Sequence, residues 1–583
     1  MVYESSIMMR VSALTMLIVC QGLIIPSVYP LSTTRWYSVN ADEKFENVTK
    51  EMIDRFLENN PDLATQLGLH DPYDCLLPDG STKRLLKNLE LEEEFLNKLK
   101  ETVNRRELND DHRLDWEVLE RVHEYSRFTH YEHRLHELNP DAFDILGGLV
   151  FMMLTRDYAP LEKRIDAIAS RLELAPRYLE EFRSRFEKSS PVKLWTEVAL
   201  ESAQGIGALF YFLLQIAKGQ VSEKTYGRLG RAVEILMPEL EKHLKWLNSL
   251  LPRSTADWAL GREKYETLIQ LRDLGMTSEQ ILKLGEDYLR KLKAERERLA
   301  QQISPGETVE CVLKKIEEDA PKTFEEALAS TEKAMEEAKE FVQKKGLATV
   351  YPEDKLYVRE TPAFVAPLIP FAAMMMPAKY DKPQIGIYVV TRPKDIANLG
   401  NHLNHRSIRN TAVHEAYPGH FLQGSVSNRQ SILRLLGNGT ETVEGWAHYC
   451  EQMMVDQGFI LDKETKLVQV NDGIWRAVRI IVDVKLSRGE MTFDDAVDML
   501  VRETGMSKEA ATAEVRRYTQ TPGYPLSYLL GKHLILQLKQ EIKEKMGSKF
   551  TEKFFHDTLT ANGYLSLSLV RKIFKQKMEQ AKS

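Results

Sequence analysis

Four things are scarce in this sequence of 583 residues: cysteine, glycine with proline, excess positive charge and long hydrophobic runs. The four cysteines share no CxxC spacing, which excludes a cysteine-based zinc ribbon and a disulfide framework but leaves a single bridge open. Glycine and proline together make up about 9% of the residues, too few for a collagenous or low-complexity chain. The formal charge of −7 gives no sign of a nucleic-acid groove or a polybasic membrane patch.

The overall composition is that of a soluble globular protein. Hydrophobic residues make up 43% of the chain and charged residues 28%, which argues against a disordered protein and against a polytopic membrane protein. Composition alone names no function.

One hydrophobic run departs from this pattern. Between Arg10 and Arg35 lie 24 uncharged residues, with an apolar centre at 13–25 that Pro26 ends. This centre fits a secretory signal better than a full membrane span of about 20 apolar residues. We therefore treat 1–40 as a signal-like or anchor-like segment and expect an extracytoplasmic or membrane-anchored protein. The alternative is a cytoplasmic protein in which this segment is a buried helix or follows a start codon assigned too early.

The rest of the sequence predicts helix after helix. Apolar residues recur at spacings of three and four, and capping-box pairs such as Thr277 with Gln280 and Thr492 with Asp495 mark helix starts. The fold class we predict is mostly α, a large multi-helix fold with a deep cleft. The clearest predicted helices are 161–188, 278–302, 323–345 and 529–545.

A stretch with seven prolines, 351–393, interrupts the helical pattern. Its runs Leu356–Val358 and Ile385–Val390 favour strands, because proline ends helices and β-branched and aromatic residues suit a pleated sheet. We expect a small β element here, just before the richest chemical segment. The predicted parts are a helical 41–350 and a C-terminal 351–583 with the site, or, as we favour, one continuous domain 41–583.

The densest group of reactive side chains lies in the segment TAVHEAYPGHFLQ. Here His414 and His420 flank Glu415. Imidazole and carboxylate are ligands that zinc prefers, and catalytic zinc sites often combine two histidines, one glutamate and a water. A glutamate beside the first histidine can take a proton from that zinc-bound water, whose pKa the metal lowers to about 7. The residue types are therefore those of a hydrolytic zinc site.

The spacing of the two histidines demands a break in the helix. In HExxH motifs the histidines lie roughly 40° apart around the helix, whereas His414 and His420, six residues apart, would lie roughly 240° apart. Pro418 and Gly419 stand between them, and this proline clashes with the carbonyl four residues earlier, that of His414 itself. We infer a kink that returns His420 to the side of His414.

A third ligand comes from the next helical segment. Glu441 and Glu444 are three residues apart and share a helix face, so spacing alone does not choose between them. Without such a ligand, the histidine pair reads as a helix cap beside a core histidine, and this alternative stays open on the residues alone.

The motifs HEAYPGHFLQ and EGWAHYCEQ resemble the domain of unknown function 885 family, a group similar to gluzincin-type zinc metallopeptidases. Further segments look like the same family and extend the resemblance over roughly residues 45–575: 61–70, 156–159, 171–172, 479–483, 517–518, 522–524, 527–528 and 531.

The resemblance implies a role for each central residue. It implies His414, His420 and Glu444 as ligands of one zinc ion per chain, with Glu415 as general base; Glu444 is preferred because the family's EGW pattern begins there. One departure concerns Ser487, which stands where this family often has histidine, and this puts specificity or turnover in doubt.

The remaining predictions concern catalysis and substrate binding. Tyr518 and Tyr528 are the preferred donors to a developing oxyanion, with Tyr524 as a substrate-binding candidate. The strand with Gly386 and Tyr388 is a candidate edge for pairing with an extended peptide.

Arg479 and Arg517 are candidate clamps for a substrate carboxylate, which would make the protein an exopeptidase acting at C-termini. The function we predict is a zinc metallopeptidase that hydrolyses peptides or oligopeptides. The alternatives are a zinc amidohydrolase of non-peptide substrates and a catalytically inactive, membrane-tethered helical binding protein. The sequence leaves the oligomeric state open.

Overall fold

The computed structural model describes residues 40–361, 369 and 371–580. The chain is 72% helical with 3% in strands, which confirms the predicted mostly-α fold. The predicted signal-like or anchor-like segment falls, except for its last residue, outside the described residues.

The described chain forms two compact units. The smaller unit comprises residues 40–254 with the short segment Ser431–Gly437, and the larger unit comprises Thr255–Gln430 with 438–580. Residues 255–350, which the sequence analysis grouped with the N-terminal part, pack within the larger unit.

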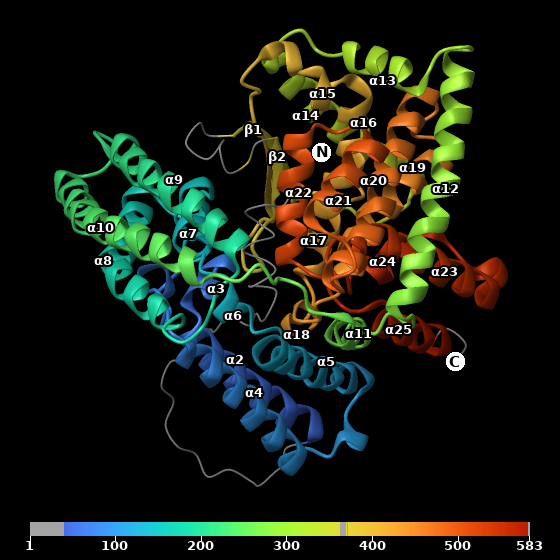
Figure 1. Cartoon of the computed structure of the whole chain (residues 1–583). Coiled ribbons are helices and arrows are strands. Elements are labelled where there is room, and N and C mark those ends of the chain that lie inside the picture. Colours follow the sequence, from blue (N-terminus) through green and yellow to red (C-terminus); the bar gives the residue numbers. More distant parts are fainter. Residues whose placement is uncertain (1–39, 362–368, 370, 581–583) are drawn as a thin grey trace. The chain divides into compact units, whose positions relative to one another are not determined.

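The smaller unit is all helical, and α10 packs against both α8 and α9 (Figure 1). Within the described part of the chain, α9 is the one helix with the length and mean hydropathy, 1.2, of a membrane span, and 33% of its apolar window is buried. The helices of this unit are α2 (Ala41–Asn59), α3 (Pro61–Gln66), α4 (Thr82–Thr102), α5 (Asp110–Phe128), α6 (Leu135–Leu138), α7 (Phe143–Thr155), α8 (Leu161–Ser184), α9 (Lys193–Ala217), α10 (Glu223–Leu250) and α18 (Ile432–Leu435).

The larger unit combines many helices with one small sheet. The long α12 lies along α20, and α19 packs on α23 (Figure 1). Its helices are α11 (Arg262–Leu271), α12 (Ser278–Ile303), α13 (Val309–Glu318), α14 (Phe324–Lys345), α15 (Gly400–Leu403), α16 (His405–Glu415), α17 (His420–Ser427), α19 (Thr440–Asp456), α20 (Lys463–Ser487), α21 (Phe493–Thr504), α22 (Lys508–Gln520), α23 (Ser527–Met546), α24 (Glu552–Thr560) and α25 (Leu567–Gln580).

The helix signals in the sequence are confirmed where they were strongest. The Thr277 side chain accepts from the Gln280 backbone, and Gln280 reaches back to the Thr277 N–H, so α12 begins with the complete capping box. Thr492 caps α21 by accepting from the Asp495 backbone N–H. The predicted helices at 161–188, 323–345 and 529–545 correspond to α8, α14 and α23, with ends within a few residues.

The predicted β element is a three-stranded sheet in the order β1-β3-β2. Strands β1 (Lys355–Glu360) and β3 (Ile385–Val390) contain the two predicted runs and pair in parallel. The sequence did not reveal β2 (Ala372–Met375), which pairs antiparallel with β3, because alanine and methionine carry no strand preference.

The position of β3 corrects one prediction. We expected the strand with Gly386 and Tyr388 to offer an open edge to a peptide, but β3 is the central strand and both of its edges are paired. Gly386 has a packing role instead, because a Cβ there would lie 2.5 Å from the Phe421 ring of α17. The glycine thus lets the helix that begins with His420 pack closely on the sheet.

Candidate metal centre

The predicted break lies between the two histidines. Helix α16 ends at Glu415 and α17 begins at His420. Gly419 is required in this turn, because a Cβ there would overlap the His414 carbonyl oxygen. The Trp446 indole of α19 donates to the Pro418 carbonyl at 2.8 Å, which ties the turn to the next helix.

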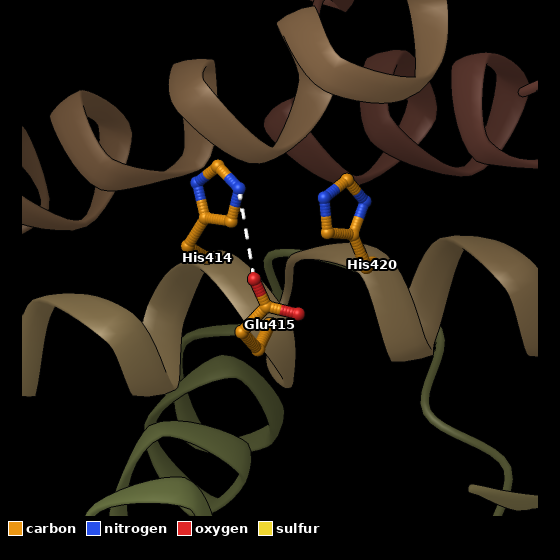
Figure 2. A group of neighbouring side chains, drawn as sticks. All are labelled: His414, Glu415 and His420. Atoms are coloured by element: carbon orange, nitrogen blue, oxygen red, sulfur yellow. Dashed lines mark ion pairs between the residues drawn. The ribbon is translucent and has the colours of Figure 1, made fainter. Parts of the chain in front are cut away.

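The break brings three side chains into one group. The imidazoles of His414 and His420 rise on the same side of the consecutive helices, with the Glu415 carboxylate beside them (Figure 2). One ligand atom from each of the three lies within 4.8 Å of the others, and the two rings stand 4.9 Å apart at 85°. Glu415 Oε1 lies 3.8 Å from His414 Nε2, and both residues are buried.

Glu444 reaches the same group from α19. Its Oε2 lies 3.4 Å from His420 Nε2, and its Oε1 accepts a hydrogen bond from the Tyr524 hydroxyl. Burial disfavours the ionised carboxylate, but the two neighbouring imidazoles and the Tyr524 hydroxyl together lower its pKa to about 2. An ionised carboxylate therefore faces the histidine pair.

The other candidate, Glu441, is engaged elsewhere. Its carboxylate forms an ion pair with Arg272 at 2.6 Å, and both side chains are buried. The structure thus separates the two glutamates that helix spacing left equivalent: Glu444 faces His420, and Glu441 holds a guanidinium.

His414 is oriented by a residue that the sequence analysis missed. Glu451 Oε1 accepts from His414 Nδ1 at 2.7 Å, and because a carboxylate only accepts, Nδ1 carries the proton and Nε2 presents its lone pair to the group. Burial would raise the pKa of Glu451, but His448, Arg476 and His414 hold it well below its usual range. A signal was available, because Glu451 follows Glu444 by seven residues and two helical turns place it on the same face.

The three candidate tyrosines occupy different places. Tyr524 alone among them donates to Glu444. The Tyr518 hydroxyl donates to Glu514 at 2.5 Å and accepts from Arg479 at 2.8 Å, so its proton is committed to a structural partner. The Tyr528 ring meets the Tyr524 ring edge-on, with centroids 6.0 Å apart. Tyr524 is thus the tyrosine in contact with the predicted ligands, and the donor roles of Tyr518 and Tyr528 stay predictions.

The two candidate clamps share one carboxylate. Glu514 Oε2 accepts from Arg479 at 3.0 Å and from Arg517 at 2.8 Å, and all three side chains are buried. The Arg479 guanidinium also lies 4.6 Å from the centre of the Tyr528 ring. The arrangement is an ion-paired cluster beside the tyrosines, and a clamp on a substrate carboxylate stays a prediction.

The donor set fits a zinc ion. His414 and His420 offer imidazole nitrogens and Glu444 an ionised carboxylate, the combination of two histidines and one glutamate that catalytic zinc sites use with an open fourth position. The carboxylate behind His414 is the outer partner that such ligands typically have. The break between α16 and α17 brings the two histidines to one side, which their six-residue spacing on a continuous helix would not do.

Two solved structures resemble this fold closely. A predicted lipoprotein of unknown function from Shewanella oneidensis has a TM-score of 0.75 at 24% identity, and the match covers 91% of this chain and 99% of that one. A predicted lipoprotein from Colwellia psychrerythraea has a TM-score of 0.80 at 18% identity, covering 93% and 100%. At these identities the likeness shows the fold alone.

Comparison with curated proteins gives no match. The family described as bacterial protein of unknown function (DUF885), by contrast, matches residues 61–573. Because this match spans most of the chain, the protein belongs to that family.

Proposed function

We propose that this protein is a zinc-dependent hydrolase that cleaves peptide bonds in peptides or oligopeptides. The observation that carries the proposal is the return of His420 to His414 across the Pro418–Gly419 break, with Glu415 in the same group and Glu444 beside it. A second support is the resemblance of the HEAYPGHFLQ and EGWAHYCEQ motifs to the domain of unknown function 885 family, a group similar to gluzincin-type peptidases. His414, His420 and Glu444 would hold the ion.

A bound zinc ion supplies Lewis acidity, which polarises a carbonyl group and lowers the pKa of water to about 7. Glu415 acts as the proton carrier. Its carboxylate is buried and next to the histidine pair, where it takes a proton from the attacking water and delivers it to the leaving amine. Cleavage of an amide requires both transfers, because an amine leaves only when it has been protonated.

The partners around the ligands orient them. Glu451 sets the tautomer of His414 through Nδ1, and Tyr524 binds one oxygen of Glu444 so that the other faces His420. Ligands held this way need little rearrangement when the ion binds, which favours affinity.

We place the protein outside the cytoplasm or at a membrane. Two observations support this location: the apolar run within 1–40 and the description of both similar structures as predicted lipoproteins.

The experiment is a comparison of two glutamate variants. Glu415→Gln replaces the carboxylate by a carboxamide of nearly the same shape that cannot take a proton. We therefore expect stoichiometric zinc and a loss of cleavage of about 10²–10⁴-fold. Glu444→Gln removes a ligand charge, so we expect loss of both zinc and cleavage. Zinc is measured by elemental analysis and cleavage by mass spectrometry of a peptide-library digest.

Each assay has an outcome that contradicts the proposal. Clearly substoichiometric zinc in the wild-type protein would refute the metal centre. Full activity of Glu415→Gln would show that the base is another group. An intact peptide library with a metal-loaded protein would point to a non-peptide amide as substrate.

A further inference from the structure

Tyr524 reaches Glu444 from the tight turn 521–526, which joins α22 to α23. Gly523 has a positive φ of 80°, and the Tyr524 N–H donates to the Thr521 carbonyl at 3.0 Å. The turn itself is neither helix nor strand, so the position of the Tyr524 hydroxyl depends on what binds the turn's backbone.

Asp483 of α20 binds the turn at two points. Its Oδ1 accepts from the Gly523 N–H at 2.8 Å, and its Oδ2 accepts from the Leu526 N–H at 3.1 Å. These two bonds bracket Tyr524 on either side. Ser487, one helical turn along α20, donates to Oδ1 at 3.2 Å.

The carboxylate of Asp483 is costly to keep buried. Burial raises its pKa to about 6, although the two backbone N–H groups and the nearby Arg272 favour the ionised form. The buried phenol of Tyr265 on α11 also faces it. A neutral apolar residue would avoid this cost but would leave two buried N–H groups without acceptors.

Arg272, just after α11, binds the same turn from the other side. Its guanidinium donates to the Gly523 carbonyl and to the Thr440 hydroxyl, and forms the ion pair with Glu441. Thr440 and Glu441 form the first turn of α19, directly before Glu444. A single guanidinium therefore connects the turn that carries Tyr524 to the helix that carries its acceptor.

Gly523 leaves room for the Arg272 guanidinium beside the turn. A Cβ at this position would lie 2.5 Å from Arg272 Nη1, and the positive φ would strain any other residue. Close contact of the guanidinium with the turn thus requires glycine.

We propose that Asp483 and Arg272 are positioning residues of the metal centre. They hold the turn 521–526 so that the Tyr524 hydroxyl binds one oxygen of Glu444 and turns the other toward His420. This inference rests on the proposed metal centre and adds the device that orients its carboxylate ligand. It also assigns a role to Ser487, which donates a hydrogen bond to Asp483.

A double-mutant cycle tests whether Asp483 acts through Tyr524. The measured quantity is zinc affinity, from competition with a chromogenic chelator, for the wild type, Asp483→Asn, Tyr524→Phe and the double variant. We expect each single change to weaken zinc binding by about 10-fold, and the double variant to bind no more weakly than Tyr524→Phe, because both changes remove the same contact.

Two further variants complete the design. Asp462→Asn, at the start of the same helix, also removes a carboxylate that accepts a backbone N–H, that of Thr465 at 2.8 Å, and we expect it to leave zinc affinity unchanged. Arg272→Lys provides an independent test should Asp483→Asn fail to fold, since an ammonium group cannot contact both the turn 521–526 and the start of α19. The effect of Arg272→Lys on zinc affinity should also vanish in the Tyr524→Phe background.

The outcomes separate this inference from the proposed function. Independent effects of Asp483→Asn and Tyr524→Phe, or unchanged affinity in Asp483→Asn and Arg272→Lys, would overturn the positioning role while the metal centre stands. Absence of zinc binding in the wild type would instead overturn the metal centre, and the inference with it.

Discussion

The two ring nitrogens of His414 have different surroundings, and this difference fixes which nitrogen faces the candidate metal centre. Nδ1 is bound to Glu451, whereas Nε2 points into the group with Glu415 and His420. The sequence identifies the histidine by its neighbours along the chain. It does not identify Glu451 as the partner of the ring, because that contact joins residues 37 positions apart on two different helices.

His243 shows the opposite case, a histidine that packing keeps neutral. It is fully buried in α10, its ring lies 4.8 Å from that of Trp246 and 5.2 Å from that of Phe143, and within the described chain its nitrogens have no hydrogen-bond partner. Burial lowers its pKa to about 3. The unfolded state, with a pKa near 6.5, therefore binds more protons between these values, so stability falls as the pH drops below about 6.5.

His243→Phe should remove this pH dependence. Relative to the wild type, we expect the variant to gain about 2 kcal/mol in free energy of unfolding on going from pH 7 to pH 5, because phenylalanine takes up no proton in the unfolded chain. Urea unfolding at both pH values measures this gain, with pH 7 as the internal reference. If the free energies of unfolding of the two proteins changed equally between pH 7 and pH 5, His243 would not be the source of this pH dependence.

At the scale of elements, the approach of α19 to α23 depends on two glycines. A Cβ at Gly445 would overlap the backbone of Gly531, and a Cβ at Gly531 would overlap the Glu441 carbonyl. Because Gly445 directly follows Glu444, the distance between these helices also sets the position of the carboxylate.

Gly445→Ala should therefore force the two helices apart. We expect a loss of stability of about 1–3 kcal/mol together with weaker zinc binding. The control is Gly230→Ala in α10, where a Cβ meets nothing within 4 Å and the gain in helix propensity should stabilise the protein by about 0.5–1 kcal/mol. Thermal unfolding and chelator competition measure both effects, and equal behaviour of the two variants would refute the packing argument.

Elements with strong local signals could be predicted, and those shaped by neighbours could not. Capping pairs and apolar periodicity located α12 and α21, and Pro418 located the break in the histidine helix. Strand β2 escaped prediction because only pairing with β3 makes it a strand. The central position of β3 also depends on that unseen neighbour.

At the scale of the whole molecule, the two compact units should respond differently to metal. All of the predicted ligands lie in the larger unit. Since a ligand stabilises only the cooperative unit that binds it, zinc at about 100 times its Kd should stabilise that unit by about 2.7 kcal/mol. We expect its calorimetric transition to rise by roughly 5 °C while that of the smaller unit stays in place.

Glu444→Gln is the control for this experiment, and zinc should shift neither of its transitions. Hydrogen exchange assigns each transition to its unit through the amides of α10 and α20. An equal shift of both transitions on adding zinc to the wild type would contradict the confinement of the site to the larger unit.

The sequence by itself determined the helical class, the capped helix ends and the residue types of the candidate metal centre, because these depend on neighbours within a few positions. Only the tertiary structure placed Glu444 beside His420 and Glu441 against Arg272, brought Glu451 to His414 and placed Tyr524, Asp483 and Arg272 around one turn. These choices join segments tens to hundreds of residues apart. Such contacts arise only when helices pack, and which oxygen faces which nitrogen is decided by distances of a few ångströms that no local pattern records.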